Sequence, residues 1–254
     1  MLLCRRSPMS SLDIETAAGR ARCGHGVGPK TVTSGPLSLI LSQRTDTGFG
    51  VWPPCVYRLM LYAGAPMLNI YRDTWSLDPA ICPCDIHFTE FLDENLTRDS
   101  AIFHFGTGAH HLVGKQVAQS GRNNVVLGIT ASVGEYESYT RLIIDNPRVG
   151  QYYKAFFGDI YQLDARLLPR FDIVTLFHLC EFRTAENDKY GALTDLALTK
   201  LLIEKTRPGG YILFYSNSMA ADRASVVISE LMTISSIERR PDFKSLQIYQ
   251  VQAA

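Results

Sequence analysis

The sequence predicts an α/β protein with a doubly wound, mostly parallel sheet that is covered by helices on both faces. Short runs of β-branched and aromatic residues alternate with longer segments in which apolar residues recur at helical spacing. The connections between these segments are short, which favours right-handed strand–helix–strand units. Two strand-like segments follow one another at the end of the chain, and they predict an antiparallel hairpin at one edge of the sheet.

A lead helix precedes the first predicted strand. Phe88, Phe91 and Leu92 share one face of residues 85–96, so this segment carries one apolar stripe. The next three strands are rich in Val, Ile and aromatic residues, and Gly121 and Pro147 end the helices between them. The predicted elements are helix Asp85–Leu96, strand Ala101–Phe105, helix His111–Gln119, strand Asn124–Thr130, helix Glu135–Asp145 and strand Tyr153–Phe157.

The second half of the predicted sheet begins with the most hydrophobic strand, which we place at its centre. Leu193, Leu196 and Leu201 share one face of the next helix, and the Pro-Gly-Gly turn that follows stops it. Asp222 is the expected N-cap of the last helix. The predicted elements are strand Phe171–Phe177, helix Lys189–Lys205, strand Tyr211–Ser216, helix Asp222–Met232 and hairpin strands Ser236–Arg240 and Ser245–Val251.

Composition narrows the class of protein. Lys plus Arg and Asp plus Glu each number 25, so the net charge is zero and favours neither nucleic acid nor an anionic membrane as partner. No apolar run reaches the roughly 18 residues of a membrane span, and the N-terminus lacks the apolar core of a secretory signal. The 6 cysteines are sparse and irregularly spaced, which suits a reducing compartment. We therefore expect a cytoplasmic protein that acts on a small molecule.

The chain divides at a change in composition near residue 66. Residues 1–66 are rich in Gly and Pro and have no sustained period, so we interpret them as a disordered extension or as residues upstream of the functional start. A transit peptide is an alternative, because the segment contains Arg and Ser and few acids. Residues 67–98 form the lead helical segment, and residues 99–254 form the main domain.

The topology predicts where a ligand binds. In open parallel sheets, ligands bind beyond the carboxyl ends of the strands, near the point where strand order reverses. The candidate residues are those that directly follow each strand: Gly106–His110, Thr130–Ser132, Gly158–Ile160, Phe177–Phe182 and Ser216–Ser218.

Four segments within about residues 100–251 resemble, in order and spacing, the class I S-adenosylmethionine-dependent methyltransferases. AIFHFGTGAHH resembles the family's strand and Gly-x-Gly-x-Gly turn, and YYKAFFGDIYQL resembles the third strand with its following acid. FDIVTLFHLCEF resembles the fourth strand with its functional loop, and TRPGGYILFYSNS resembles the turn into the fifth strand. The resemblance implies a Rossmann-like sheet of about seven strands, S-adenosylmethionine as cofactor, and methyl transfer to a small-molecule acceptor.

The resemblance also implies a set of cofactor-binding residues. Gly106 and Gly108 allow close approach and positive φ, and the free N–H groups of the next helix suit a carboxylate. Asp159 either accepts hydrogen bonds from an adenine amino group or caps the short helix that follows it. The implied set is His104, Gly106, Thr107, Gly108, His110, Thr130, Asp159, Ile160 and Phe177.

Three positions depart from the family pattern. His104 stands where an acid is usual, His110 replaces the third glycine, and Thr130 replaces the acid at the end of the second strand. Glu135 either compensates for the acid missing at Thr130 or serves only to stabilise the first turn of its helix. We expect aspartates at positions 104 and 130 to strengthen cofactor binding.

These departures leave other functions open. One alternative is a non-catalytic methyltransferase-like binding domain with a degenerate pocket. A nicotinamide-dependent oxidoreductase is disfavoured, because the third glycine of its phosphate-binding motif would fall at His111.

His178 and Glu181 are the candidate catalytic residues. They follow the fourth strand, where His178 could take a proton from a hydroxyl or amine acceptor, or could simply be a hydrogen-bonded histidine at a strand end. Cys82, Cys84 and His87 are soft metal ligands at short spacing. No fourth ligand is evident beside them, so we predict no metal site and interpret the cysteines as small buried residues at a helix start.

Overall fold

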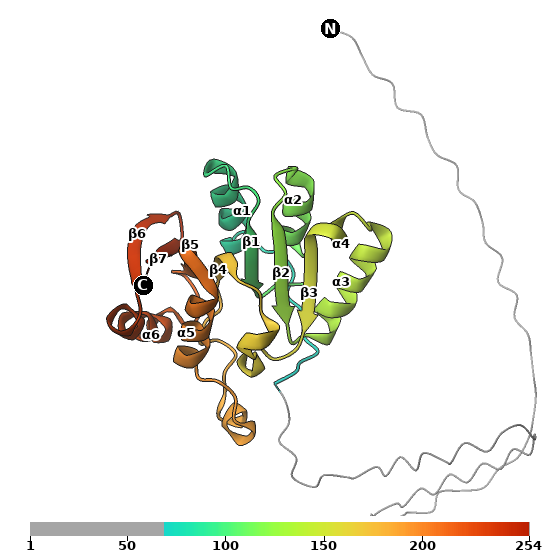
Figure 1. Cartoon of the computed structure of the whole chain (residues 1–254). Coiled ribbons are helices and arrows are strands. Elements are labelled where there is room, and N and C mark those ends of the chain that lie inside the picture. The colour runs from blue at the N-terminus through green and yellow to red at the C-terminus, as the bar shows by residue number, and fades with distance from the viewer. Residues whose placement is uncertain (1–68, 254) are drawn as a thin grey trace, which may run out of the picture. The chain divides into compact units, whose positions relative to one another are not determined.

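A computed structural model describes residues 69–253, and within this range the chain forms one seven-stranded sheet of order β3-β2-β1-β4-β5-β7-β6 (Figure 1). The first five strands are parallel, and β7 pairs antiparallel with both β5 and β6. The strand order reverses between β1 and β4. The predicted Rossmann-like sheet with a C-terminal antiparallel hairpin is thereby confirmed.

The strands are β1 Ala101–Phe105, β2 Val125–Thr130, β3 Tyr153–Phe157, β4 Phe171–Thr175, β5 Thr206–Tyr215, β6 Ile237–Phe243 and β7 Leu246–Val251. The α-helices are α1 Cys84–Glu94, α2 Leu112–Ser120, α3 Val133–Asp145, α4 Val149–Tyr152, α5 Asp195–Lys205 and α6 Ala221–Ile234. The 3₁₀ helices are η1 Ile160–Gln162, η2 Ala165–Leu167 and η3 Ala185–Tyr190. The bounds of β1 and β3 coincide with the predicted ones.

Helices cover both faces of the sheet, as the alternation of strands and helices predicts. Successive residues of β1 point to opposite faces, so Ile102 and Phe103 belong to different hydrophobic clusters. The Phe103 cluster includes Leu198 of α5 and Leu231 of α6. The second cluster contains residues of α1, α2, α3 and α4, among them Phe88, Val117, Tyr139 and Val149. The lead helix α1 is therefore part of the main core.

The structure corrects the predicted start of helix α5. Residues 185–190 form the 3₁₀ helix η3, and Gly191, with φ of +69°, ends it. Thr194 then caps α5 by accepting a hydrogen bond from the Ala197 N–H. A left-handed residue cannot continue a helix, so the segment predicted as one helix is two.

Other boundaries also differ from the prediction, and β5 begins at Thr206, so the Pro-Gly-Gly segment predicted as a turn lies within this strand. Asp222 is not the N-cap of α6, because the helix begins at Ala221 and Asp222 lies within its first turn. The hairpin turn falls at Lys244 and Ser245, since β6 continues through Pro241 to Phe243. Pro241 is tolerated there because β6 is the edge strand of the sheet.

The interpretation of residues 1–66 lies outside the described residues. No helix within residues 69–253 combines the length and apolar character that a bilayer crossing requires.

Candidate functional site

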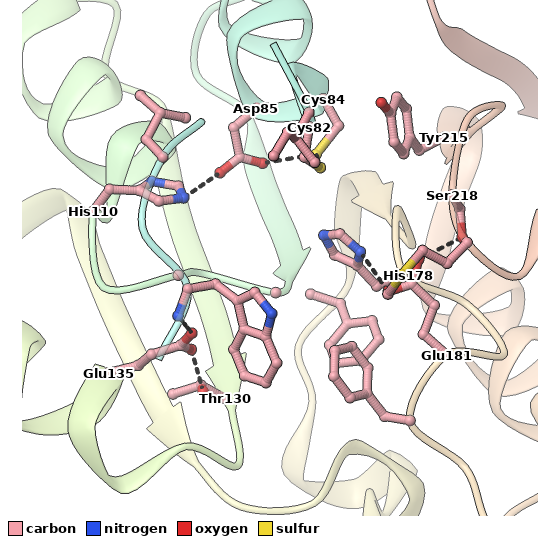
Figure 2. A pocket seen from close by; sticks show the side chains of 18 of the residues that line it. Cys82, Cys84, Asp85, His110, Thr130, Glu135, His178, Glu181, Tyr215 and Ser218 are labelled. Carbon is pink, nitrogen blue, oxygen red and sulfur yellow. Dashed lines mark hydrogen bonds and ion pairs between the residues drawn. The ribbon is translucent and has the colours of Figure 1, made fainter. Parts of the chain in front are cut away.

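A cavity of about 270 Å³ lies at the carboxyl ends of the parallel strands, at the edge that the topology predicts (Figure 2). Its wall includes Phe105 at the end of β1, Thr130 at the end of β2 and Tyr215 at the end of β5. Of the predicted site residues, Gly106, Gly108, His110, Thr130, His178 and Glu181 line it. The others, His104, Thr107, Asp159, Ile160 and Phe177, are buried and do not belong to its lining.

The glycine turn after β1 has the left-handed backbone expected of it. Gly106 has φ of +89° and Gly108 has φ of +54°. A Cβ on Gly106 would lie 2.7 Å from Cδ2 of His178. A Cβ on Gly108 would lie 2.4 Å from Nε2 of His110 and 3.1 Å from the carbonyl oxygen of Trp75. Both glycines are therefore required by backbone conformation and by close packing against the cavity wall.

The lead segment crosses this edge of the sheet as a strap, residues 69–77. The Tyr71 N–H donates to the carbonyl of Ala131, and the Ala109 N–H donates to the carbonyl of Trp75. The rings of Tyr71 and Trp75 both contact Phe182, each with centroids 5.6 Å apart. These aromatic residues are not among the predicted site residues, although aromatic side chains in a short polar segment indicate a contact surface.

Glu135 brings a carboxylate to the end of β2. Thr130 Oγ1 donates to Glu135 Oε2 at 2.6 Å, and the Trp75 N–H donates to Oε1 at 3.3 Å. The side chain is buried, and burial raises the pKa of Glu135. Ser132 caps α3 by accepting from the Glu135 N–H, so Glu135 lies in the first turn of this helix. Glu135 is therefore a first-turn acid that also lines the cavity beside Thr130. That it compensates for the missing acid stays a prediction.

Asp85 supplies a second carboxylate, which the sequence analysis did not identify. It is buried in the first turn of α1 and lines the cavity. Nε2 of His104 lies 3.6 Å from Asp85 Oδ1, and Nε2 of His110 lies 3.8 Å from Oδ2. Oδ2 has no hydrogen-bond partner among the described residues. Although burial raises the pKa of Asp85, the charges of His104 and His110 hold it below the ordinary value.

His178 and Glu181 lie together on the opposite wall of the cavity (Figure 2). Nδ1 of His178 donates to Glu181 Oε2 at 3.0 Å, and Ser218 Oγ donates to Oε1 at 2.6 Å. Burial lowers the pKa of His178, but the hydrogen bond and charge of Glu181 outweigh it, and the net shift is upward. Because a carboxylate only accepts, Nδ1 carries the proton and Nε2 is left with a free lone pair when His178 is neutral.

Asp159 acts as a cap, as the simpler interpretation of this residue expects. Oδ1 accepts from the Tyr161 N–H at the start of η1. Oδ2 accepts from Asn187 Nδ2 at 3.1 Å and from the hydroxyl of Tyr190 at 2.6 Å. Ile160 lies in a hydrophobic cluster of the core. A contact of either residue with a cofactor stays a prediction.

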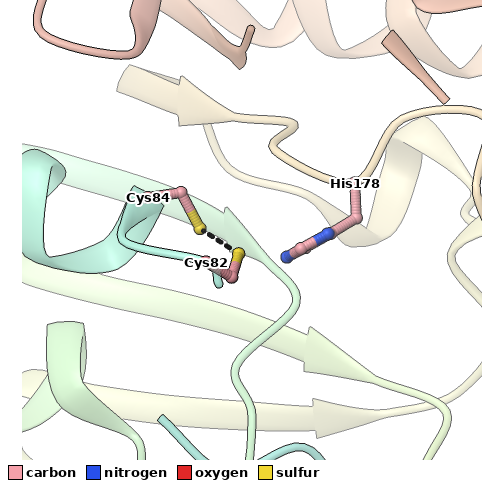
Figure 3. A group of neighbouring side chains, drawn as sticks. All are labelled: Cys82, Cys84 and His178. Carbon is pink, nitrogen blue, oxygen red and sulfur yellow. Dashed lines mark hydrogen bonds between the residues drawn. The ribbon is translucent and has the colours of Figure 1, made fainter. Parts of the chain in front are cut away.

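Cys82 and Cys84 lie on the cavity wall, but their histidine neighbour differs from the one the sequence suggests. Nδ1 of His87 forms a hydrogen bond with Ser245 Oγ at 2.6 Å. The ring of His178 lies beside the sulfur atoms instead (Figure 3). His87 is therefore not part of this cluster, because its ring is directed toward Ser245 at the terminal hairpin. Cys82 Sγ and Cys84 Sγ share a hydrogen bond, and this bond lowers the pKa of Cys82 to about 6.

His111 predicts a pH dependence of stability. It is buried, its Nε2–H donates to the carbonyl of Glu135, and its Nδ1 accepts from the Tyr153 hydroxyl. Burial lowers the pKa of His111 to about 4, whereas the ordinary value is 6.5. The unfolded chain therefore takes up a proton first as the pH falls. We expect the free energy of unfolding to decrease between pH 6.5 and pH 4, by up to about 3 kcal/mol from this group.

The measurement is urea unfolding of wild type and His111→Asn at several pH values in that window. Asn tolerates the left-handed backbone of His111, which has φ of +47°, and does not titrate. The variant should be less stable near pH 7.5, because it loses buried contacts, and its stability should depend less on pH. Equal pH slopes for the two proteins would contradict the assignment.

Comparison with known proteins bears on the fold. The sequence matches no known family model and no curated protein. The CcbJ methyltransferase from Streptomyces caelestis is similar in structure, with a TM-score of 0.50 and 13% identity over 70% of this chain and 94% of that one. A methyltransferase from Aquifex aeolicus that depends on S-adenosylmethionine gives a TM-score of 0.47 and 11% identity, over 69% and 98% of the two chains.

An O-methyltransferase family protein from Burkholderia thailandensis gives a TM-score of 0.48 and 13% identity over 68% of this chain. This chain spans 56% of the length of that protein. At 13% identity and a TM-score of 0.50, the likeness to the CcbJ methyltransferase concerns the fold alone.

Proposed function

We propose that this chain, which has the fold of the class I S-adenosylmethionine-dependent methyltransferases, binds S-adenosylmethionine and methylates a small molecule. The observation that carries the proposal is the pair of buried carboxylates, Asp85 and Glu135, on the wall of the cavity at the carboxyl ends of β1 and β2. The cofactor has an ammonium group and two ribose hydroxyls, and carboxylates are the acceptors that suit both.

The donors and acceptors of the cavity fit this cofactor. Oδ2 of Asp85 is buried without a hydrogen-bond partner, so it is an acceptor suited to an ammonium group. Glu135 and Thr130 at the end of β2 suit ribose hydroxyls, and Trp75 and Phe182 offer aromatic faces to a cation. When bound, S-adenosylmethionine supplies a methyl group on a cationic sulfur that a nucleophile can attack.

The residues on the opposite wall suit an acceptor that loses a proton. Neutral His178 has a free Nε2 lone pair, and the hydrogen bond with Glu181 holds the ring in one orientation. It can accept the proton of a hydroxyl, thiol or amine, and the nearby carboxylate stabilises the imidazolium that forms. The strap aromatics Tyr71 and Trp75 limit the access of water to this space.

A second candidate function is a binding domain without catalysis. It is favoured by the close packing of the glycine turn, because His178 lies against Gly106, and His110 and Trp75 lie against Gly108. These residues occupy the space that a ligand in contact with the two glycines would need. The two functions differ in an observable way: only the first forms S-adenosylhomocysteine when S-adenosylmethionine and an acceptor are present.

Glu135→Gln should weaken the affinity for S-adenosylmethionine and S-adenosylhomocysteine by about 10-fold to 100-fold, because a charged acceptor of two hydroxyl groups becomes a neutral amide. Isothermal titration calorimetry measures both ligands. Glu137→Gln is the matched control, since Glu137 is exposed on the same helix α3. If wild type binds both ligands and Glu135→Gln binds them equally well, Glu135 does not hold the ribose. If wild type binds neither ligand, the binding-domain function becomes the better proposal.

A further inference from the structure

We propose that Cys82, Cys84 and His178 form a binding site for a zinc ion on the wall of the cavity. The sulfur atoms of the two cysteines and a ring nitrogen of the histidine all lie within 4.8 Å of one another (Figure 3). All three residues line the same cavity. The sequence indicates the two cysteines but not the histidine, because His178 follows β4 and lies almost a hundred residues after them.

The spacing of the ligand atoms suits a tetrahedral ion. Cys82 Sγ and Cys84 Sγ are 3.4 Å apart. Zinc–sulfur bonds of about 2.3 Å at a tetrahedral angle place two sulfur atoms about 3.8 Å apart. A small rotation of the cysteine side chains therefore closes the site. Two thiolates and one imidazole are soft ligands, which favour zinc over magnesium or calcium.

The histidine is held as metal-binding histidines usually are. A histidine that binds metal through one ring nitrogen usually donates a hydrogen bond from the other ring nitrogen to a carboxylate. This bond fixes the tautomer and the orientation of the ring. Here Nδ1 of His178 donates to Glu181, and Ser218 donates to the other oxygen of that carboxylate. The ring nitrogen without this bond is the one that faces the two sulfur atoms (Figure 3).

A tight turn and the start of helix α1 fix the positions of the two cysteines. The Cys82 N–H donates to the carbonyl of Asp78 at 2.8 Å, which forms a turn before Pro83. Pro83 is the N-cap of α1, and Cys84 is the first residue of this helix. The turn and the helix start thus present both sulfur atoms to the side on which His178 lies.

A site of three protein ligands leaves a fourth position of the metal open, which is typical of catalytic rather than structural zinc. Because the cavity borders all three ligands, an acceptor hydroxyl or thiol within it can take that position. A bound zinc would lower the pKa of that group. His178 would then be a ligand, so the role as a base proposed above would apply to the protein without zinc. Metal binding itself does not depend on the proposed methyl transfer.

The test is a cobalt titration of the full-length, reduced protein in which Cys4, Cys23 and Cys55 are replaced by Ser. We expect one Co²⁺ per chain, with sulfur-to-cobalt charge-transfer absorption and the strong visible bands of a tetrahedral site. Addition of Zn²⁺ should remove both signals. X-ray absorption of the zinc form should give two sulfur neighbours at about 2.3 Å and one nitrogen neighbour at about 2.0 Å.

Single variants assign the ligands. Cys82→Ser, Cys84→Ser and His178→Ala should each abolish the cobalt absorption, and Glu181→Gln should weaken metal affinity by about 10-fold to 100-fold. Cys180→Ala and His87→Gln are the matched controls and should keep the absorption, since Cys180 is buried elsewhere in the core and His87 is bonded to Ser245. Thermal melts establish that each variant is folded.

The proposal is overturned if the parent protein gives no sulfur-to-cobalt absorption, or if this absorption persists in folded Cys82→Ser and Cys84→Ser. It is also overturned if the zinc form has no sulfur neighbours, a result that does not depend on any variant. S-adenosylmethionine is absent from all of these measurements, so failure of the metal site and failure of cofactor binding are separate results.

Discussion

Replacing Gly108 with Val should abolish the binding of S-adenosylhomocysteine, whereas the same replacement at Gly121 should leave it nearly unchanged. The two glycines have similar left-handed backbones, with φ of +54° and +67°. A Cβ at position 108 meets the ring of His110 and the carbonyl of Trp75, and a Cβ at position 121 meets nothing within 4 Å. Backbone strain is thus common to both variants. Only the variant at position 108 displaces the wall of the cavity.

Calorimetry with S-adenosylhomocysteine measures the effect, which we expect to be at least about 100-fold in affinity, or about 2.7 kcal/mol. Thermal melts of both variants separate this loss from unfolding. Gly108→Ala, a smaller change at the same position, serves if the Val variant does not fold. If folded Gly108→Val keeps the native affinity, the glycine turn does not contribute to the ligand site.

The sequence predicts most of the fold because the relevant signals are local. Strand β1 is a short β-branched and aromatic run followed by glycine, and its predicted bounds are exact. Two of the misplaced boundaries each occur at a single residue that has a left-handed backbone conformation. Gly191 separates η3 from α5, and Lys244 adopts φ of +53° at the hairpin turn. The residues around both positions are mostly polar, so apolar periodicity cannot locate them.

The sequence predicts the site residues that follow strands but not those of the lead segment, and this difference has a physical reason. The rule that ligands bind at strand ends identifies Thr130, which ends β2, and His178 and Glu181, which lie in the loop after β4. Asp85, Cys84 and Trp75 come from the lead segment, whose position over the sheet depends on tertiary packing of α1 and the strap. No periodicity within that segment indicates which strand ends it faces.

Neighbouring helices bear on two of the positions that depart from the methyltransferase pattern. His104 and Thr130 stand where the family usually has acids, and each contacts an acid from another element. His104 faces Asp85 of α1, and Thr130 donates to Glu135 of α3. The carboxylates are therefore present at this edge of the sheet but come from neighbouring helices. This geometry reverses the expectation that aspartates at positions 104 and 130 strengthen cofactor binding.

We expect His104→Asp and Thr130→Asp each to destabilise the fold, by about 3–5 kcal/mol for the first. His104→Asp replaces the imidazole beside buried Asp85 with a second carboxylate, and Thr130→Asp removes the hydroxyl donor of Glu135 and adds a like charge. Like charges at such distances in a buried site cannot both ionise without a large cost. Urea unfolding at pH 7.5 measures the loss, and calorimetry shows whether any cofactor affinity remains.

Paired substitutions show whether repulsion from Asp85 and Glu135 causes the loss of stability. Glu135→Thr in the Thr130→Asp background, and Asp85→Asn in the His104→Asp background, restore a single carboxylate at each place. Each pair should recover most of the lost stability, so the two changes should be strongly non-additive in a double-mutant cycle. Additive losses, or tighter cofactor binding by His104→Asp and Thr130→Asp alone, would mean that Asp85 and Glu135 do not take the place of the family's acids. If a pair recovers both stability and cofactor affinity, a carboxylate is needed at that place in the cavity. It would then not matter whether the carboxylate comes from a strand end or from a neighbouring helix.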